Sequence, residues 1–312
     1  MTTTDLKLVF LGAGKRLSLL ERFLDAARAE NVRLSLICVE AQDRPPVASV
    51  AKIVRGPKFS SPEFAPHLTE LVAREGAHAV IPTMDAACTA LSACARALPC
   101  AAIVSDHALC AAMEDKVASD EFFRSHGLPV PTLSPGAYPR IAKSRRGFGS
   151  RDQAVLETAE DEAAFFARRA RDGYIVQPFL RGREFTVDAY VDRGGRALGA
   201  LSRLRIEVSA GEVDVSETLR RPAILALTRR VLALPGWRGP ITLQFIEADP
   251  ESSAPALIEI NPRFGGGVTH AIHCGLDMPR WILRELLGRP VEPADDWPEH
   301  SFMTRCRRDI FL

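Results

Sequence analysis

Strand-like and helix-like stretches take turns along the first hundred residues. The apolar runs with the length of buried strands are 6–11, 34–39, 79–82 and 101–104. The segments with apolar residues at helical spacing or with helical composition are 16–29, 61–75 and 86–97. Regular alternation of strand and helix predicts a parallel sheet with helices on both faces.

The pattern changes beyond about residue 105. A helix is predicted from Glu114 to about His126, where Pro129 and Pro131 prevent its continuation. A second helix is predicted after Thr158. Short strands are predicted at 140–143, 154–157 and 174–178. Together these elements indicate a small mixed αβ unit.

The remainder of the chain predicts another sheet. Residues 184–192 and 197–205 form a hairpin over Arg193-Gly194-Gly195. The further strands are predicted at 241–246 and 257–260, and the helices at 222–234 and 278–287. Three units follow from this reading: residues 1–112, 113–180 and 181–312.

The stretch Leu257-Ile258-Glu259-Ile260-Asn261-Pro262-Arg263-Phe264-Gly265-Gly266-Gly267 carries the most chemistry. Glu259 and Asn261 are two residues apart on a strand, so their side chains point to one face. Hard oxygen ligands suit Mg²⁺. Arg263 shares that face if the strand continues, and consecutive glycines let backbone N–H groups surround an anion. Taken alone, the stretch is equally well explained as a strand that ends in a glycine-rich turn.

Upstream, Lys143 ends the predicted strand 139–143 and precedes a basic loop that contains Gly147, Gly149 and Ser150. A lysine at a strand end beside a flexible loop is a common arrangement for holding a triphosphate. Two strand-like runs then flank a short linker, with Gln177 before it and Glu184 after it. The predicted strand 241–246 presents Gln244, fifteen residues before Glu259.

In this order, the lysine, the glycine loop, the linker with its late glutamate, the strand glutamine and Glu-x-Asn-Pro-Arg resemble the ATP-grasp superfamily. The resemblance extends from about residue 115 to 288 and is closest to the branch of the carbamoyl-phosphate synthetase large subunit. It implies an α/β protein with the ATP-grasp fold: an N-terminal Rossmann-like domain, a small αβ lid and a C-terminal mixed αβ grasp domain.

The resemblance also implies cofactors, ATP and Mg²⁺ with Mn²⁺ as an alternative, and residue roles. Glu259, Asn261 and Gln244 hold the metal. Lys143 contacts the α- and β-phosphates, and Glu184 binds the ribose hydroxyls. Arg263 faces the γ-phosphate or an acyl phosphate.

The loop with Gly147, Gly149 and Ser150 is expected to close over the triphosphate. The hinge backbone contacts adenine; its residues are Gln177, Pro178, Phe179 and Leu180. Many relatives carry a glutamate in place of Gln177, but backbone contacts are unaffected by this difference.

Two further groups leave alternatives open. Arg203 and Arg205 share one strand face, where a basic residue contacts either the transferred phosphoryl group or a substrate carboxylate; a surface ion-pair ladder is equally consistent with the spacing. Asp188 is expected to be structural. His270 and His273 lack the H-E-x-x-H spacing of a metal site and are expected to line a pocket or cap a helix.

The predicted function is an ATP- and Mg²⁺-dependent carboxylate–amine ligase that acts through an acyl phosphate on small, amino-acid-like molecules. The alternative is a catalytically silent ATP-binding module that regulates a partner protein. A dinucleotide-dependent oxidoreductase is disfavoured, because Gly12-Ala13-Gly14 is followed by Leu17 where the third glycine of the fingerprint belongs.

Composition makes nucleic-acid-binding and membrane-spanning functions less plausible and indicates the cellular location. A net charge of +1 with 25% charged residues gives no basic excess for nucleic acid. No apolar run approaches about 18 residues, so no membrane span is expected. Seven cysteines without a C-x-x-C pair and the absence of a signal-like start indicate a soluble cytoplasmic protein with reduced thiols. A homodimer is the default expectation for its assembly.

Overall fold

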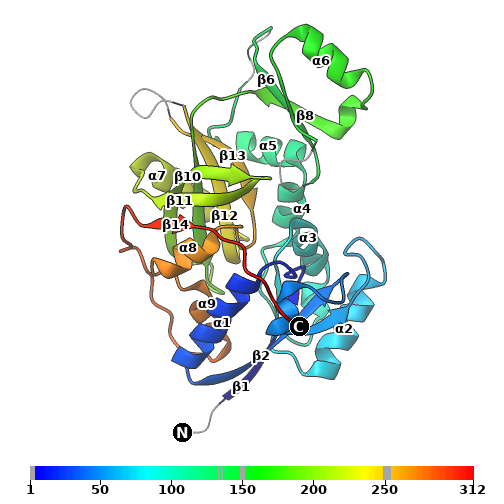
Figure 1. Ribbon diagram of the computed structural model, residues 1–312, viewed down its shortest axis with the longest axis vertical. Coiled ribbons are helices and arrows are strands. Elements are labelled where there is room, and N and C mark those ends of the chain that lie inside the picture. Colours follow the sequence, from blue (N-terminus) through cyan, green and yellow to red (C-terminus); the bar gives the residue numbers. More distant parts are fainter. Residues whose placement is uncertain (1–3, 133, 135, 148–151, 249–253) are drawn as a thin grey trace.

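The structure is a computed structural model that describes residues 4–132, 134, 136–147, 152–248 and 254–312. Three sheets organise the chain into three lobes (Figure 1). The first lobe is at the lower right of this view, the middle lobe is at the top, and the sheet of the last lobe lies to the left. Each sheet falls within one of the three units that the sequence pattern separates.

The first lobe is a parallel sheet in the order β3-β2-β1-β4-β5. Leu8 and Phe10 of its central strand pack on the side of α1, while Val9 and Leu11 pack on the side of α2. Burial of both faces explains the continuous apolar run. The elements are β1 (Thr4–Leu11), α1 (Leu17–Ala29), β2 (Val32–Glu40), β3 (Lys52–Arg55), α2 (Phe64–Glu75), β4 (Ala79–Pro82), α3 (Asp85–Cys94) and β5 (Ala101–Ala102).

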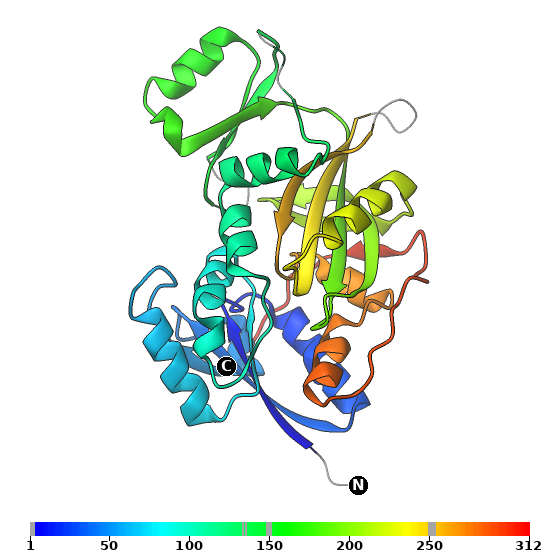
Figure 2. The same ribbon diagram turned by 180° about the vertical axis from the view of Figure 1, so that it is seen from behind.

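Two helices connect the first lobe to the others. They are α4 (His107–Glu114) and α5 (Lys116–Ser125), and Figure 2 shows them running upward from the first lobe towards the middle lobe. Helix α5 begins at Asp115, whose carboxylate accepts hydrogen bonds from the N–H groups of Val117 and Ala118. The sequence pattern predicted α5 but not α4, because the small side chains of the alanine-rich segment give only a weak apolar stripe.

The middle lobe is a small antiparallel sheet in the order β7-β6-β8. Its helix begins with a reciprocal cap, in which Thr158 accepts from the Asp161 N–H and Asp161 accepts from the Thr158 N–H. The elements are β6 (Arg140–Ser144), β7 (Ala154–Leu156), α6 (Ala159–Phe166) and β8 (Tyr174–Pro178).

The last lobe is an antiparallel sheet in the order β13-β12-β9-β10-β11-β14. The hairpin, the two later strands and both helices that the sequence predicts are present. The elements are β9 (Arg183–Val191), β10 (Ala197–Ser209), β11 (Glu212–Thr218), α7 (Pro222–Leu232), β12 (Gly239–Glu247), β13 (Ala256–Asn261), α8 (Val268–His273), α9 (Met278–Leu286) and β14 (Phe302–Thr304).

The two faces of this last sheet differ in polarity. Phe185, Val187, Leu243 and Phe245 project from β9 and β12 into a core that is covered by α4, α5 and α7. Glu184, Thr186 and Asp188 of β9 and Thr242 and Gln244 of β12 alternate with these residues and face the other way. Strand periodicity therefore gathers the polar side chains on a single surface.

The first and last lobes share a hydrophobic core. Helix α1 packs against α8 and α9, and the ring of Phe23 contacts that of Phe264 edge-to-face at 5.9 Å between centroids. The segment after β14 then crosses the boundary between these lobes and ends beside the first one (Figure 1). Within the described residues, no helix has the length and apolar character needed to cross a bilayer.

Candidate active site

The three predicted metal ligands lie on adjacent strands of the last sheet. Gln244 of β12 is directly opposite Glu259 of β13, and Thr242 is directly opposite Asn261. Side chains paired in this way across antiparallel strands project from the same face. One carboxylate and two amide groups, all able to offer oxygen, therefore lie side by side. Hard oxygen donors of this kind fit a Mg²⁺ ion that shares its coordination with phosphates and water.

The same face continues onto β9. Thr186 is opposite Gln244, and Glu184 is opposite Ile246 on β12. Glu184 is half-buried and forms an ion pair with Arg205, with 3.1 Å between Oε1 and Nε. The glutamate that the resemblance assigns to ribose binding thus lies on β9, the strand next to β12 with its predicted metal ligand, and Arg205 is held beside it.

Lys143 brings a cation to this face from the middle lobe. Burial lowers the pKa of Lys143, while the negative charge of Glu259 and, more weakly, that of Glu184 work in the opposite direction. This lysine is thus close enough to both carboxylates to feel their field.

The loop after Lys143 is attached to the start of α5. The Arg145 guanidinium donates twice to Asp115, at 3.1 and 2.7 Å, and Lys116 Nζ donates to the carbonyl oxygen of Gly147 at 3.2 Å. Gly147 has a backbone φ of 135°, a region that favours glycine. Of the predicted phosphate-loop residues, Gly149 and Ser150 lie outside the described residues.

The predicted hinge lies at the end of β8. The Gln177 side chain donates to Asp120 of α5 at 3.1 Å, so the amide group has a structural contact. The Phe179 N–H donates to the carbonyl oxygen of Pro139 at 3.0 Å, whereas neither Pro178 nor Leu180 donates a backbone hydrogen bond within the described part of the chain. Among these three residues, Leu180 has the only N–H group without an acceptor in the described part of the chain.

Arg203 and Arg205 do not form a surface ladder. Arg203 is 1% exposed and donates through Nε to the fully buried Asp188 at 2.8 Å. Asp188 also accepts from Thr242 at 3.3 Å. The expectation that Asp188 is structural agrees with these contacts. Arg205 pairs with Glu184 instead, and burial lowers its pKa.

The glycine run is explained largely by this buried pair. A Cβ atom on Gly265 would lie 2.8 Å from Asp188 Oδ1, and one on Gly267 would lie 2.8 Å from Arg203 Nη1. Gly266 has no atom closer than 3.9 Å to such a position. Two of the three glycines therefore permit close approach of the turn to a buried ion pair.

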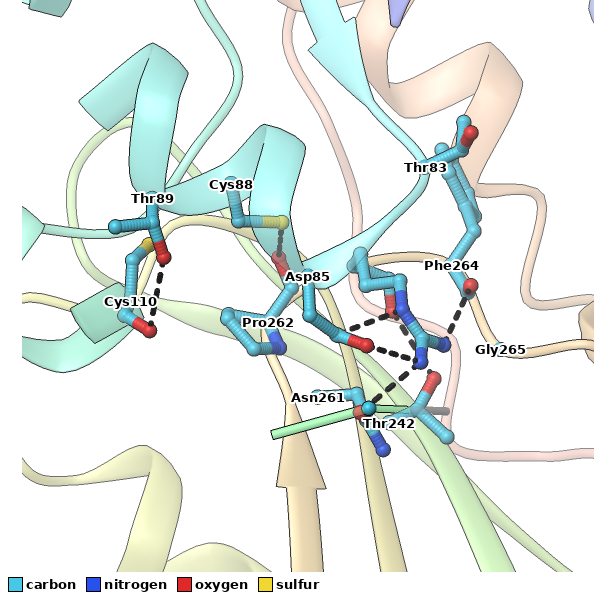
Figure 3. A network of polar contacts seen from close by, with 12 residues as sticks. Thr83, Asp85, Cys88, Thr89, Cys110, Thr242, Asn261, Pro262, Phe264 and Gly265 are labelled. Carbon is cyan, nitrogen blue, oxygen red and sulfur yellow. Dashed lines mark hydrogen bonds and ion pairs between the residues drawn. The ribbon is translucent and has the colours of Figure 1, made fainter. Parts of the chain in front are cut away.

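Strand β13 ends at Asn261, so Arg263 lies on the turn and not on the strand face. Its guanidinium still reaches the site: it donates to Asn261 Oδ1 at 3.0 Å and makes two bonds to Asp85, at 2.9 and 3.0 Å (Figure 3). Burial acts to lower the pKa of Arg263, but the Asp85 carboxylate outweighs it and holds this pKa above its ordinary value.

Asp85 was not singled out from the sequence. It opens α3 directly after β4, at the carboxyl end of the parallel sheet, where α/β proteins commonly place functional groups. Arg16 was also not singled out, although it has a comparable position after β1 of the same sheet. It donates through Nη2 to the carbonyl oxygens of Phe264 and Gly265, at 3.3 and 2.5 Å. Burial and the nearby Arg263 lower the pKa of Arg16 to about 10.

His270 belongs to the packing of this region. It lies on the short helix α8, is 2% exposed, and contacts the hydroxyl groups of Ser216 and Ser301 at 2.9 and 3.2 Å. Burial lowers its pKa to about 4, so the ring is neutral at neutral pH. No cluster of three His, Cys, Asp or Glu side chains suited to a metal occurs in the part of the chain that the structure describes. The metal candidates are instead the mixed carboxylate–amide set on β12 and β13.

Comparison with known proteins bears on the fold of the chain. Residues 170–307 match a family model described as ATP-grasp in the biosynthetic pathway with Ter operon. No curated protein matches the sequence significantly.

Solved structures match almost the entire chain. One is N5-carboxyaminoimidazole synthetase from Staphylococcus aureus in complex with ADP, with a TM-score of 0.77, 12% identity, and coverage of 98% of this chain and 83% of that one. The L-amino acid ligase from Bacillus licheniformis matches with a TM-score of 0.69 and 19% identity, over 93% of this chain and 76% of that one. A third match is the biotin carboxylase domain of Hydrogenobacter thermophilus 2-oxoglutarate carboxylase in complex with MgADP, ADP and bicarbonate. Its TM-score is 0.70 and its identity 18%, over 95% of this chain and 73% of that one. These likenesses confirm the ATP-grasp fold that the resemblance implies.

Proposed function

We propose that this chain, which has the ATP-grasp fold, is an ATP- and Mg²⁺-dependent ligase that joins a small carboxylate to an amine. The observation that carries the proposal is the polar face of the last sheet. Glu184, Gln244, Glu259 and Asn261 project from it, and Lys143 of the middle lobe lies within their electrostatic range. Carboxylates for a metal and a cation for phosphate are what a triphosphate site requires.

Each side chain has a role in this proposal. Glu259, Asn261 and Gln244 hold Mg²⁺, which neutralises charge on the phosphates when bound. Lys143 balances the charge of the α- and β-phosphates, and Glu184 accepts hydrogen bonds from the ribose. The loop that contains Gly147, Gly149 and Ser150 covers the triphosphate and keeps water away from the reacting group.

The reaction has two steps. A carboxylate oxygen of the substrate attacks the γ-phosphorus, which gives an acyl phosphate and ADP. An amine nitrogen then attacks the acyl carbon, so that the C–N bond forms, inorganic phosphate leaves and the amine loses a proton. Arg263, fixed between Asp85 and Asn261, stabilises the phosphoryl group during its transfer.

The likeness to solved ligases agrees with this chemistry. Relatives of this fold have been solved with ADP and with MgADP, and one of them is an L-amino acid ligase. An amino-acid-like substrate is therefore part of the proposal, as are a homodimeric assembly and a cytoplasmic location. The alternative, a silent ATP-binding module, is disfavoured because the lysine, the metal ligands and Arg263 are all intact.

The test combines the purified protein with ATP, Mg²⁺, hydroxylamine and pools of carboxylic and amino acids. Hydroxylamine traps an acyl phosphate as a hydroxamate. Hydroxamate in one pool that is abolished by Glu259→Ala supports the ligase and identifies the carboxylate. ATP binding without hydroxamate in any pool contradicts a stand-alone ligase and favours the silent module. If ATP does not bind, both functions are excluded.

A further inference from the structure

Four guanidinium groups surround the glycine turn, defined here as residues 264–267. Three of them contact its carbonyl oxygens: Arg16 as described above, Arg263 with Nη1 3.3 Å from the Phe264 oxygen, and Arg305 with Nη2 2.7 Å from the Gly266 oxygen. Arg203 lies against the end of the turn, where only the missing side chain of a glycine leaves room for it.

Among the described residues, three of these four cations have a carboxylate within ion-pair distance and Arg16 has none. The three ion pairs are Arg203–Asp188 at 2.8 Å, Arg263–Asp85 at 2.9 Å and Arg305–Glu212 at 2.5 Å. Across the described ranges, no carboxylate lies within ion-pair distance of Arg16, and neither its Nε nor its Nη1 donates to another residue. Arg16 therefore contributes a positive charge that no described carboxylate contacts directly.

An unpaired cation away from bulk water is costly unless an anion accompanies it. The position of Arg16 indicates which anion that is. Arg16 and Arg263 both donate to the carbonyl oxygen of Phe264, so the two guanidinium groups approach the same atom. The charge of Arg263 is already neutralised by Asp85. Arg16 is therefore the guanidinium beside the proposed phosphoryl site whose charge is available to a bound anion.

We infer that Arg16 binds the substrate carboxylate that attacks the γ-phosphate of ATP. This inference rests on the proposed ligase function and assigns to it a residue from the first lobe. A carboxylate and a triphosphate repel each other, and an unpaired guanidinium next to Arg263 offsets that repulsion. The Nε and Nη1 groups of Arg16, which donate to no other described residue, offer hydrogen-bond donors that a carboxylate accepts.

The γ-phosphate itself is the competing anion, and the experiment separates the two. Arg16→Gln removes the charge, and Arg16→Lys keeps a cation in case the first variant folds poorly. Lys15→Gln is the matched control, because it removes the same charge from an exposed neighbour in the same loop. Calorimetry measures binding of MgADP with and without beryllium fluoride, which mimics the γ-phosphate, and the hydroxamate assay measures KM for the carboxylate found above.

Arg16→Gln is expected to raise KM for the carboxylate by about tenfold or more, with both nucleotide affinities within about twofold of wild type. Arg16→Lys should recover part of the loss, and Lys15→Gln should match wild type. A selective loss of beryllium fluoride affinity would assign Arg16 to the γ-phosphate and overturn the inference. An unchanged KM would overturn it as well.

A second readout needs no turnover. The same acid pools are added with MgADP, and the midpoint of thermal unfolding is recorded. At least one pool should raise the midpoint of wild type and of Lys15→Gln, but not that of Arg16→Gln. If wild type shows this shift without forming hydroxamate, the ligase proposal fails and carboxylate binding at Arg16 stands. If no pool shifts wild type, or all variants shift equally, the carboxylate site is refuted.

Discussion

Arg263 and Asp85 face each other across the boundary between the first and last lobes, joined by two hydrogen bonds of 2.9 and 3.0 Å. The same guanidinium donates to Asn261, one of the proposed metal ligands (Figure 3). A planar guanidinium held at both edges has little freedom to rotate. The first lobe thereby fixes the orientation of a cation at the proposed phosphoryl-transfer site.

Asp85→Asn keeps the shape of this side chain and removes its charge. The pair is partly buried, so we expect a loss of about 2 kcal/mol in the free energy of unfolding, between the values for exposed and fully buried pairs. Hydroxamate formation should also slow, because Arg263 is no longer held. A double-mutant cycle with Arg263→Met measures the coupling; losses that simply add would show that the two residues act independently.

Glu259 is the only carboxylate in the proposed metal set, directly opposite Gln244. Glu259→Gln should therefore raise the Mg²⁺ concentration needed for ADP binding by about tenfold or more, because metal affinity depends strongly on ligand charge. Gln244→Glu should lower it. Calorimetric titrations of ADP at several Mg²⁺ concentrations test both changes, and equal Mg²⁺ dependence in all three proteins would refute the assignment.

Substitutions in the glycine turn test whether its glycines are required by close packing against the buried ion pair or by contact with a nucleotide. Gly267→Ala places a methyl group 2.6 Å from Val213 and 2.8 Å from Arg203, and should cost about 1–3 kcal/mol of stability. Gly266→Ala, with nothing closer than 3.9 Å, should be nearly neutral. Chemical denaturation of both variants provides the comparison, and equal losses would show that the close contact with the buried ion pair is not the reason for glycine.

Glu30, at the end of α1, accepts hydrogen bonds from three arginines of the last lobe: Arg280, Arg284 and Arg289. Burial opposes its ionisation, but these bonds prevail and lower its pKa from 4.5 to about 2. A carboxylate whose pKa is lower in the folded state stabilises the fold above pH 4.5, and the contribution fades as the pH falls towards 2.

This lowering of the Glu30 pKa corresponds to about 3 kcal/mol of the free energy of unfolding at neutral pH. Unfolding free energies of wild type and Glu30→Gln should therefore differ most above pH 5 and converge as the pH falls through this window. Asp25→Asn on the same helix is a suitable control, because its carboxylate is largely exposed to solvent and pairs only with exposed arginines. A difference between wild type and Glu30→Gln that does not change with pH would contradict the role of this carboxylate.

The sequence alone determined much of the sheet that carries the site. Side chains alternate along a strand with a period of two, so Glu259 and Asn261 had to share a face wherever the strand lay. The predicted strands and helices of the last lobe also depend on local patterning. The short strands β4 and β7 were predicted, but β3, β11 and β14 were not, because pairing with neighbouring strands fixes them more than their own apolar pattern does.

Only the tertiary structure decided which charges meet. Arg263 and Asp85 are 178 residues apart, and Arg16 lies 249 residues from Gly265. The sequence placed Arg263 on the strand face only if the strand continued, but β13 ends at Asn261 and the turn directs Arg263 towards the first lobe. Local patterning specifies which way a side chain points from its own element. The partner of a charge depends on how separate elements pack, and no local pattern records that.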